Sequence, residues 1–254
     1  MTTLPIDDKT FTGIIPARYA SSRLPGKVLC DLDGKPMIQR VYESVKKWPN
    51  WTRLLVATDS DIVVNACKDL GIESMITSDK HLDCLDRSAE VAQTLENEGK
   101  GTDRYIIIQG DEPLFNIKTL EADYSHEVIN FYTEVQDPEE LDNRNAVKVV
   151  VSDCDTAVYF SRLTLPFDGE KTRRSTSPRV VYKQIGVYAF SGRRLKLYAS
   201  SKPSYLECME GIGLNRFISY NIPIVMQYTP FDSISVDTEE DRLRIIKLIK
   251  NEQN

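Results

Sequence analysis

The sequence predicts an α/β protein built on a mainly parallel sheet, and three observations support this class. Short apolar segments alternate with amphipathic helical segments along the first half of the chain, which is typical of βα units. The chain has 254 residues, enough to bury a full core in one large domain. A loop of basic and small residues follows the first apolar segment, at the sheet edge where open α/β proteins bind ligands.

The first half of the chain reads as a regular series of strands and helices. Residues 36–48 carry apolar side chains at helical spacing after Pro36, which suits the first turn of a helix. A second helix ends at Gly71, the expected C-terminal position. The expected strands are 11–17, 54–58, 72–77 and 105–109, and the expected helices are 36–48, 61–70 and 85–97.

The second half is less regular but contains no repeat and no low-complexity tract. Residues 117–131 are predicted to form a helix and 130–145 a polar connection. The segment 167–183 is rich in charge and hydroxyls, and we interpret it as a mobile segment or dimer-forming arm. A single domain over 1–254 is expected, with a loop or dimerisation arm around 160–220. Further strands are expected at 147–152, 157–160, 185–190 and 224–227, and a final helix over 238–251, capped by Asp237 or Thr238.

The composition argues against several functions. A net charge of −6 disfavours nucleic acid as a partner. No stretch has the length of a transmembrane helix and the first residues lack the features of a leader, so we expect a cytoplasmic protein with no membrane partner. Five cysteines without a close pair fit a reducing compartment. With only two histidines, a catalytic metal should be a hard ion held by carboxylates.

Residues 14–27 are the most informative segment. Arg18, Arg23 and Lys27 are separated by small residues that include Ala17 and Ser22. Closely approaching backbone N–H groups, guanidinium forks and an ammonium group are what a polyphosphate requires. The alternative is an ordinary strand followed by a solvated basic loop. The position at the end of the first strand favours phosphate binding.

Two acidic segments are candidate metal ligands. Asp111 lies in the turn 109–113 after a strand of three isoleucines, a suitable place for Mg²⁺ on a nucleotide phosphate. The alternative is a polar turn that only ends the strand. Asp237 lies in an Asp-Thr-x-x-Asp pattern that also makes an ordinary helix cap, and the local pattern favours the cap.

Three further positions carry weaker signals. Thr58 and Asp59 end the second strand and are candidates for reading a base edge, although a strand-ending Asp is commonly a turn former. In the segment 83–87 the acidic residues are possible helix caps, and Arg87 faces either a ligand or solvent. Cys84 is expected to be a buried small residue rather than a nucleophile, because no base is evident beside it.

Several motifs together resemble a known family, the 3-deoxy-manno-octulosonate (Kdo) cytidylyltransferases. They occur in the family's order and cover nearly the whole chain, and the first and fourth are quite specific. The motifs are Ile-Pro-Ala-Arg-Tyr-Ala-Ser-Ser-Arg-Leu-Pro-Gly-Lys at 15–27, Gly-Lys-Pro-Met-Ile at 34–38, Ala-Thr-Asp at 57–59, Gln-Gly-Asp-Glu-Pro at 109–113, Tyr-Phe-Ser-Arg at 159–162 and Val-Asp-Thr at 236–238.

The resemblance implies a Rossmann-like, three-layer nucleotide-binding fold of the nucleotide-diphospho-sugar transferase type. It implies Mg²⁺ dependence, commonly a homodimer, and transfer of CMP from CTP to a sugar acid. Arg18, Arg23 and Lys27 would hold the triphosphate, while Asp111 and Asp237 would ligate the metal, against the local preference for a cap. Arg18, Lys27, Asp111 and Asp237 are the implied catalytic residues, and the substrate contacts are Ala17, Ser22, Arg23, Thr58, Asp59, Arg87, Gln109, Arg162, Gln184, Tyr188 and Glu210.

The sequence departs from the family pattern at three places. Asp83-Cys84-Leu85-Asp86-Arg87 stands for Ser-Gly-Thr-Asp/Glu-Arg, residue Gln184 stands for a His, and the segment 209–216 differs from Leu-Glu-Gln-Leu-Arg. These changes concentrate on the pocket side, whereas the phosphate and metal residues are retained. The pattern favours a different acceptor over a loss of catalysis.

Three functions therefore remain open. The first is a cytidylyltransferase whose acidic acceptor is Kdo, a modified ulosonic acid or a phosphonate-type acid. The second is a non-catalytic nucleotide-binding protein, disfavoured because a binder has no need of two metal carboxylates. The third couples a nucleotide to a sugar 1-phosphate, for which a Gly-rich loop is expected instead of Pro-Ala-Arg.

Overall fold

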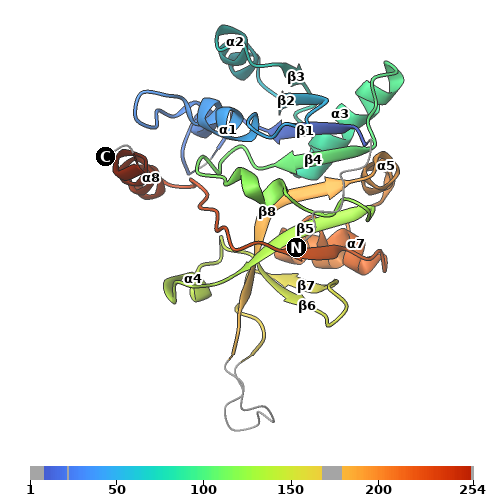
Figure 1. The fold of residues 1–254 in the computed structure, drawn as a ribbon. Helices are drawn as coiled ribbons and strands as arrows, with labels where there is room; N and C mark the ends of the chain where they lie inside the picture. Colours follow the sequence, from blue (N-terminus) through green and yellow to red (C-terminus); the bar gives the residue numbers. More distant parts are fainter. Residues whose placement is uncertain (1–8, 22, 168–178, 253–254) are drawn as a thin grey trace.

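The structure, a computed structural model, describes residues 9–21, 23–167 and 179–252. Its strands form one nine-stranded sheet with the order β3-β2-β1-β4-β8-β5-β9, to which β6 and β7 are joined through β8 (Figure 1). The strands are β1 (Phe11–Pro16), β2 (Arg53–Thr58), β3 (Ser74–Ile76), β4 (Arg104–Ile108), β5 (Val128–Glu134), β6 (Lys148–Val151), β7 (Ala157–Ser161), β8 (Tyr182–Phe190) and β9 (Val225–Tyr228).

The strand directions confirm a mixed, mainly parallel sheet. β1 pairs in parallel with β2 and β4, and β5 pairs in parallel with β9. β8 runs antiparallel to both β4 and β5 and so joins the two parallel parts. The helices are η1 (Lys27–Leu29), α1 (Met37–Val45), α2 (Asp61–Asp69), α3 (Cys84–Asn97), η2 (Ile117–Leu120), α4 (Glu139–Asp142), α5 (Gly192–Ser200), α6 (Tyr205–Glu210), α7 (Asn215–Ser219) and α8 (Glu239–Glu252).

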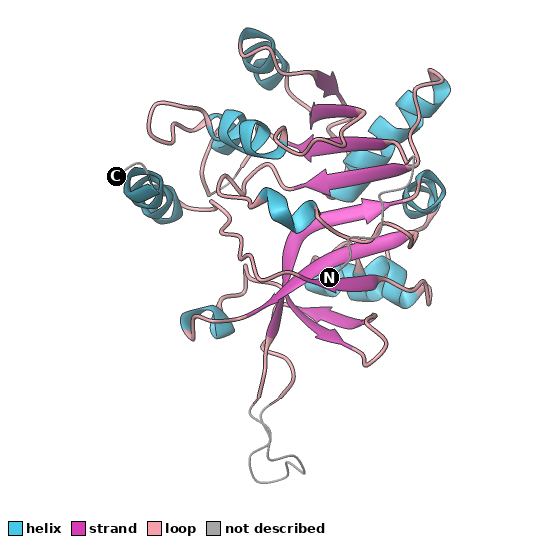
Figure 2. Cartoon of the chain, in the orientation of Figure 1, coloured by secondary structure: helices cyan, strands magenta, loops and turns pink. Residues whose placement is uncertain are grey.

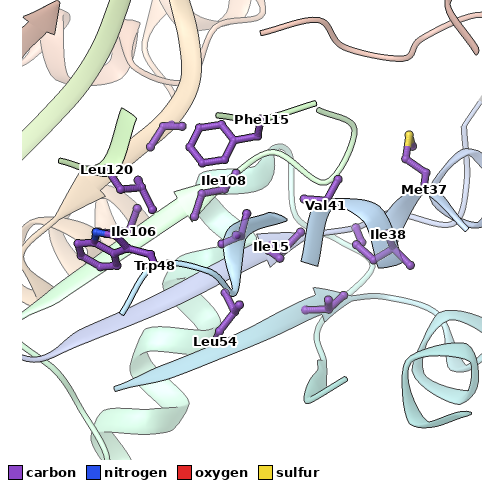
Figure 3. Close-up of a cluster of buried hydrophobic side chains, with 14 of the residues drawn as sticks. Ile15, Met37, Ile38, Val41, Trp48, Leu54, Ile106, Ile108, Phe115 and Leu120 are labelled. Atoms are coloured by element: carbon purple, nitrogen blue, oxygen red, sulfur yellow. The ribbon is translucent and has the colours of Figure 1, made fainter. Parts of the chain in front are cut away.

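Helices cover both faces of the sheet, which gives the predicted three layers (Figure 2). Side chains of a strand alternate between faces, so the apolar run of β4 serves two cores. Ile106 and Ile108 pack into the core beneath α1, α2 and α8 (Figure 3). Tyr105 and Ile107 pack into the second core beneath α3, α5 and α7. This explains why the central strands read as unbroken apolar segments.

The predicted helix over 117–131 is wrong. Only 117–120 form a short 3-10 helix, and Val128–Glu134 are the strand β5. Its Val-Ile-Asn-Phe-Tyr-Thr sequence is rich in β-branched and aromatic residues, and β8 and β9 flank it in the sheet. The pairing with strands distant in sequence decides the conformation. The predicted connection 130–145 consequently contains the end of β5 and the short helix α4.

The range 160–220 is mostly packed structure. It contains the strand β8 and the helices α5, α6 and α7. None of these three helices was predicted from the sequence. Leu195 and Phe217 are buried in the second core. The expectation of a loop over 160–220 is therefore wrong for the residues in these elements, and a dimerisation arm stays a prediction. Residues 168–178 of the segment between β7 and β8 lie outside the described part of the chain.

Candidate active site

Lys27 joins the two predicted metal carboxylates. Its Nζ lies 2.6 Å from Asp111 Oδ2 and 3.0 Å from Asp237 Oδ1. Burial alone would lower the pKa of Lys27, but the charges and hydrogen bonds of the two carboxylates outweigh it and raise the pKa above its usual value. The ammonium therefore remains charged, and the site holds two acidic side chains around one cationic position.

A backbone contact brings the two carboxylates together. Val236 N donates to the carbonyl oxygen of Asp111 over 2.9 Å, so the turn after β4 lies against the segment that enters α8. The cap of α8 is formed by other residues, because Asp241 Oδ2 accepts from Thr238 N at 2.8 Å and Thr238 Oγ1 accepts from Asp241 N at 3.2 Å. The predicted cap at Thr238 is confirmed, and the carboxylate of Asp237 faces the site instead.

The basic loop surrounds this pair. Arg23 donates to Asp237 Oδ1 at 2.9 Å and to Asn145 Oδ1 at 3.1 Å. Arg18 donates to the carbonyl oxygen of His81 at 2.6 Å. Gly26 has a φ of 65°, a left-handed conformation that favours glycine, and this turn leads into the short helix that carries Lys27. Of the other predicted loop residues, Ala17 is buried and continues the pairing with Ala57, and Ser22 lies outside the described residues.

Two cavities meet at this point. One of about 390 Å³ lies along the basic loop and is lined by Arg18, Lys27 and Arg87. The other, of about 340 Å³, lies under α4 and β8. The residues that line both are Arg23, Cys84, Gln109, Asp111 and Asp237. We call the first the phosphate cavity and the second the acceptor cavity; their shared wall is where two bound reactants could touch.

The turn after β4 packs closely against the end of β1. A Cβ on Gly110 would lie 2.6 Å from the carbonyl oxygen of Pro16, so only glycine allows the two strand ends to approach this closely. The amide of Gln109 donates to Cys84 Sγ at 3.2 Å and holds the wall between the cavities. Glu112 follows Asp111 and bonds to Ser233; burial raises the pKa of Glu112 to about 7.

The predicted base-reading residues lie at the end of β2. Thr58 is buried, and its carbonyl oxygen already accepts from Thr77 N at 2.7 Å. Neither Thr58 nor Asp59 is among the described residues that line the two cavities. In this structure the Thr58 carbonyl is bonded to Thr77 and the Asp59 carboxylate to Arg87, and their expected contact with a base stays a prediction. Arg87 does not face solvent either, because it is fully buried and donates to Asp59 Oδ2 at 2.7 Å.

The segment 83–87 is held by internal contacts. Asp83 caps α3, accepting from Leu85 N at 2.9 Å and from the Tyr198 hydroxyl at 2.6 Å. Asp86 pairs with Arg216 at 3.1 Å. Burial raises the pKa of the Cys84 thiol, which disfavours the thiolate that a nucleophilic cysteine needs. Both acidic residues of this departure are thus bonded to neighbours within the fold, Asp83 through uncharged donors and Asp86 through an ion pair.

Arg162 and Glu210 form one structural unit. Glu210 accepts from Ser161 Oγ at 2.9 Å and from Arg162 N at 3.0 Å, and it is not among the described residues that line the acceptor cavity. This geometry therefore gives no direct support to a substrate contact by Glu210. Arg162 does line the cavity, and its guanidinium donates to the carbonyl oxygens of Glu210, Arg144 and Gly211.

Gln184 and Tyr188 both lie on the acceptor cavity, as predicted. The cavity also contains charged residues that sequence reasoning missed. Lys183 is almost fully buried and pairs with Glu140 at 2.5 Å and Asp232 at 2.7 Å. These residues come from β8, α4 and the segment before α8, and no local pattern in the sequence links the three.

The residues present fit a magnesium ion. Among the described residues, no group of three or more His, Cys, Asp and Glu side chains is arranged to hold a metal. Mg²⁺ is commonly bound by one or two carboxylates together with substrate phosphates. Asp111 and Asp237 supply hard oxygen ligands beside the phosphate cavity, which is this kind of site. Within the described chain, no helix is both long and apolar enough to span a membrane.

Comparison with known proteins identifies the family. A family model described as Cytidylyltransferase matches residues 12–227. The 3-deoxy-manno-octulosonate cytidylyltransferase of Koribacter versatilis is 36% identical over 94% of this chain and 89% of that protein. The chain belongs to the 3-deoxy-manno-octulosonate cytidylyltransferase family. The Parabacteroides distasonis enzyme of the same name is also 36% identical, over 95% of this chain and 98% of that protein.

Solved structures agree with this family. A CMP:2-keto-3-deoxy-manno-octonic acid synthetase complexed with CTP has a TM-score of 0.85 and 31% identity, covering 96% of this chain and 99% of that one. HddC from Yersinia pseudotuberculosis, complexed with GMP-PN, has a TM-score of 0.65 at 16% identity and shares the fold. Membership of the 3-deoxy-manno-octulosonate cytidylyltransferase family confirms both the resemblance in the motifs and the predicted fold class.

Proposed function

We propose that this protein transfers CMP from CTP to a hydroxyl of 3-deoxy-manno-octulosonate or a closely related sugar acid, with release of pyrophosphate. The observation that carries the proposal is the position of Asp111 and Asp237 on the wall between the phosphate and acceptor cavities, with Lys27 of the phosphate cavity bonded to both. Relatives over nearly the whole chain are named for this reaction, and a structural neighbour is a complex with CTP.

The reaction needs no nucleophile from the protein. The acceptor hydroxyl oxygen forms a bond to the α-phosphorus of CTP, the bond from this phosphorus to the bridging oxygen breaks, and the proton of the hydroxyl is released. Arg18, Arg23 and Lys27 surround the phosphate cavity and offset the charge that develops on the departing pyrophosphate. The chain contributes mainly by holding the acceptor hydroxyl in line with the α-phosphorus of CTP across the wall at Gln109.

Asp111 and Asp237 would hold Mg²⁺. When bound, this ion supplies a Lewis acid that stabilises charge on the phosphate oxygens. With nucleotide present, the phosphates offer Lys27 and Arg23 new anionic partners, which leaves the two carboxylates available to the metal.

The acceptor cavity suits an acid. The guanidinium of Arg162 donates to three backbone carbonyl oxygens, although its charge also acts on the Glu210 carboxylate and, against the effect of burial, helps to lower the pKa of that group. An acceptor carboxylate beside this guanidinium would complete the pair. Arg244 adds a second guanidinium to the same cavity.

We also infer a homodimer in the cytoplasm. Tyr205 and Met209 lie one turn apart on α6 and are 76% and 67% exposed. Phe167, which follows β7, is 87% exposed. The hydrogen bonds of Arg162 to residues 210–211 tie these two segments together. Exposed apolar groups of this size commonly mark a protein interface, and the free cysteines suit a reducing compartment.

A pyrophosphate-release assay with CTP and Mg²⁺ tests the proposed reaction. The acceptor panel contains Kdo, modified ulosonic acids, phosphonates and sugar 1-phosphates, and mass spectrometry identifies the CMP conjugate. Release with Kdo or a related acid supports the proposal. Release only with a sugar 1-phosphate, or tight CTP binding without release from any acceptor, would refute it.

A further inference from the structure

β8 carries a two-residue bulge opposite Asn130 of β5. Asn130 pairs with Tyr188, whereas the next residue of β5 pairs with Ile185, so residues 186–187 have no partner on β5. On the other side of the bulge, Gln109 N donates to the carbonyl oxygen of Gly186 at 3.1 Å. The bulge thus lies between β5 and the turn that carries the site residues.

The Asn130 side chain spans this bulge. It is fully buried, and its Nδ2 donates to the carbonyl oxygens of Ile185 at 3.1 Å and Val187 at 2.7 Å. Carbonyl oxygens can only accept hydrogen bonds, so the amide can take only this orientation. Oδ1 of Asn130 must therefore face the remaining neighbour, Gln184.

This orientation determines which atom of Gln184 is free. Gln184 Nε2 donates to Asn130 Oδ1 at 2.9 Å. The amide oxygen Oε1 is then the other polar atom of a side chain that lines the acceptor cavity. It has no hydrogen-bond partner among the residues that the structure describes.

We propose that Asn130 is a positioning residue that orients Gln184, and that Gln184 is a specificity-determining residue whose Oε1 accepts a hydrogen bond from a hydroxyl of the sugar-acid acceptor. This inference rests on the proposed function and names the polarity of one subsite. An amide oxygen repels a carboxylate but accepts from a hydroxyl. The carboxylate of the acceptor consequently lies elsewhere in the cavity, and the subsite at Gln184 selects an acid that carries a hydroxyl there.

Steady-state kinetics with Gln184→Met, which keeps the length but removes both polar atoms, tests the contact. The KM for the acceptor should rise about 3- to 10-fold, the loss of one neutral hydrogen bond, while the KM for CTP stays within about twofold. Among acceptors that each lack one hydroxyl, one should show the raised KM with wild type and no further rise with Gln184→Met. An unchanged acceptor KM, or an equal rise for CTP, overturns the contact.

The positioning role predicts coupling between the two residues. Asn130→Ala should raise the acceptor KM in the same direction, and Asn130→Ala with Gln184→Met should be no worse than the more affected single variant. Thr12→Val is the matched control, since it removes a buried hydroxyl that bonds to Thr102 at 2.9 Å, at the start of β1, and should leave the acceptor KM unchanged. Fully multiplicative effects of the two changes overturn the coupling.

A readout without turnover separates this inference from the proposed reaction. In the free protein, NMR should show slow hydrogen exchange at the side-chain amides of Asn130 and Gln184, and Asn130→Ala should remove the protection at Gln184. Fast exchange at Gln184 in wild type overturns the positioning role even if CMP transfer is confirmed. Protection without any pyrophosphate release supports the positioning role and refutes only the proposed reaction.

Discussion

Val236 donates its backbone N–H to the carbonyl oxygen of Asp111 over 2.9 Å. Through this hydrogen bond the turn after β4 and the start of α8 present their carboxylates to the same ammonium group, that of Lys27. Because the contact joins two backbones, a change of side chain at position 111 or 237 leaves the frame of the site in place. Chemistry and folding can therefore be tested separately here.

Asp111→Asn should abolish most turnover while the fold survives. The amide has the same shape but loses the charge that metal and ammonium require, and losses of about a hundredfold or more are typical when charge stabilisation of a transition state is removed. Pyrophosphate release measures the loss, and circular dichroism with a thermal melt checks the fold. Normal turnover in a folded variant would contradict the metal-binding role.

We expect Asp237 to act in turnover and Thr238 to act in stability. Asp237→Asn is expected to reduce turnover with little effect on stability, because Asp241 and Thr238 form the helix cap. Thr238→Ala removes that cap and should lower the free energy of unfolding by about 1 kcal/mol with turnover retained. Urea unfolding and the activity assay compare the two variants, and a reversed pattern would show that Asp237 is the cap.

Gly186→Ala should damage both stability and acceptor use. An added Cβ would lie 2.0 Å from Glu112 Oε1 and 2.8 Å from Gln109 Cγ, so the bulge must move away from the turn. Forced repacking of this kind costs roughly 1–3 kcal/mol. Thermal unfolding and the acceptor KM should both change, whereas Gly99→Ala, where a Cβ meets nothing within 4 Å, should leave the acceptor KM unchanged. A wild-type melting temperature for Gly186→Ala would contradict the close packing.

The contribution of Asp83 to the free energy of unfolding should decrease as the pH rises through the acid range. Burial raises the pKa of Asp83 above its ordinary value of 3.8, although the hydrogen bond from Tyr198 opposes this. Between the ordinary pKa and the raised one, the folded chain holds a proton that the unfolded chain has lost, so the contribution of this group to stability decreases with pH. Asp83→Asn, which keeps a capping side chain, should flatten this part of the curve. Denaturant titrations of both proteins across the acid range measure it, and parallel curves would contradict the raised pKa.

Met209→Asp should yield a monomer if α6 lies in the proposed dimer interface. A carboxylate on this exposed apolar face would be desolvated at an interface, whereas in a monomer it stays in water and is tolerated. Light scattering after size-exclusion chromatography gives the mass of each protein. Leu243→Asp, on an exposed part of α8, is the matched control, and a dimer that persists in Met209→Asp would exclude α6 from the interface.

The sequence alone was sufficient for the parts of the protein whose signals are local. The first four strands and the helices between them were predicted at nearly their observed bounds, because each carries its own apolar period and its own end signals. The basic loop and Asp111 follow directly after such strands, so their place at the sheet edge could be deduced as well.

Tertiary structure decided the rest, because those choices depend on residues far apart in the chain. Residues 128–134 form a strand since β8 and β9 flank them, and their own sequence did not settle helix against strand. Asp237 is free to face Lys27 because Asp241 takes over the cap of α8. Thr58 and Arg87 are buried beside Thr77, which donates to the Thr58 carbonyl oxygen and accepts from the Arg87 guanidinium. Arg87 also donates to Asp59, and it still lines the phosphate cavity. Packing settles which polar side chain meets a ligand and which meets a neighbour, because most buried hydrogen-bonding groups find a partner within the fold.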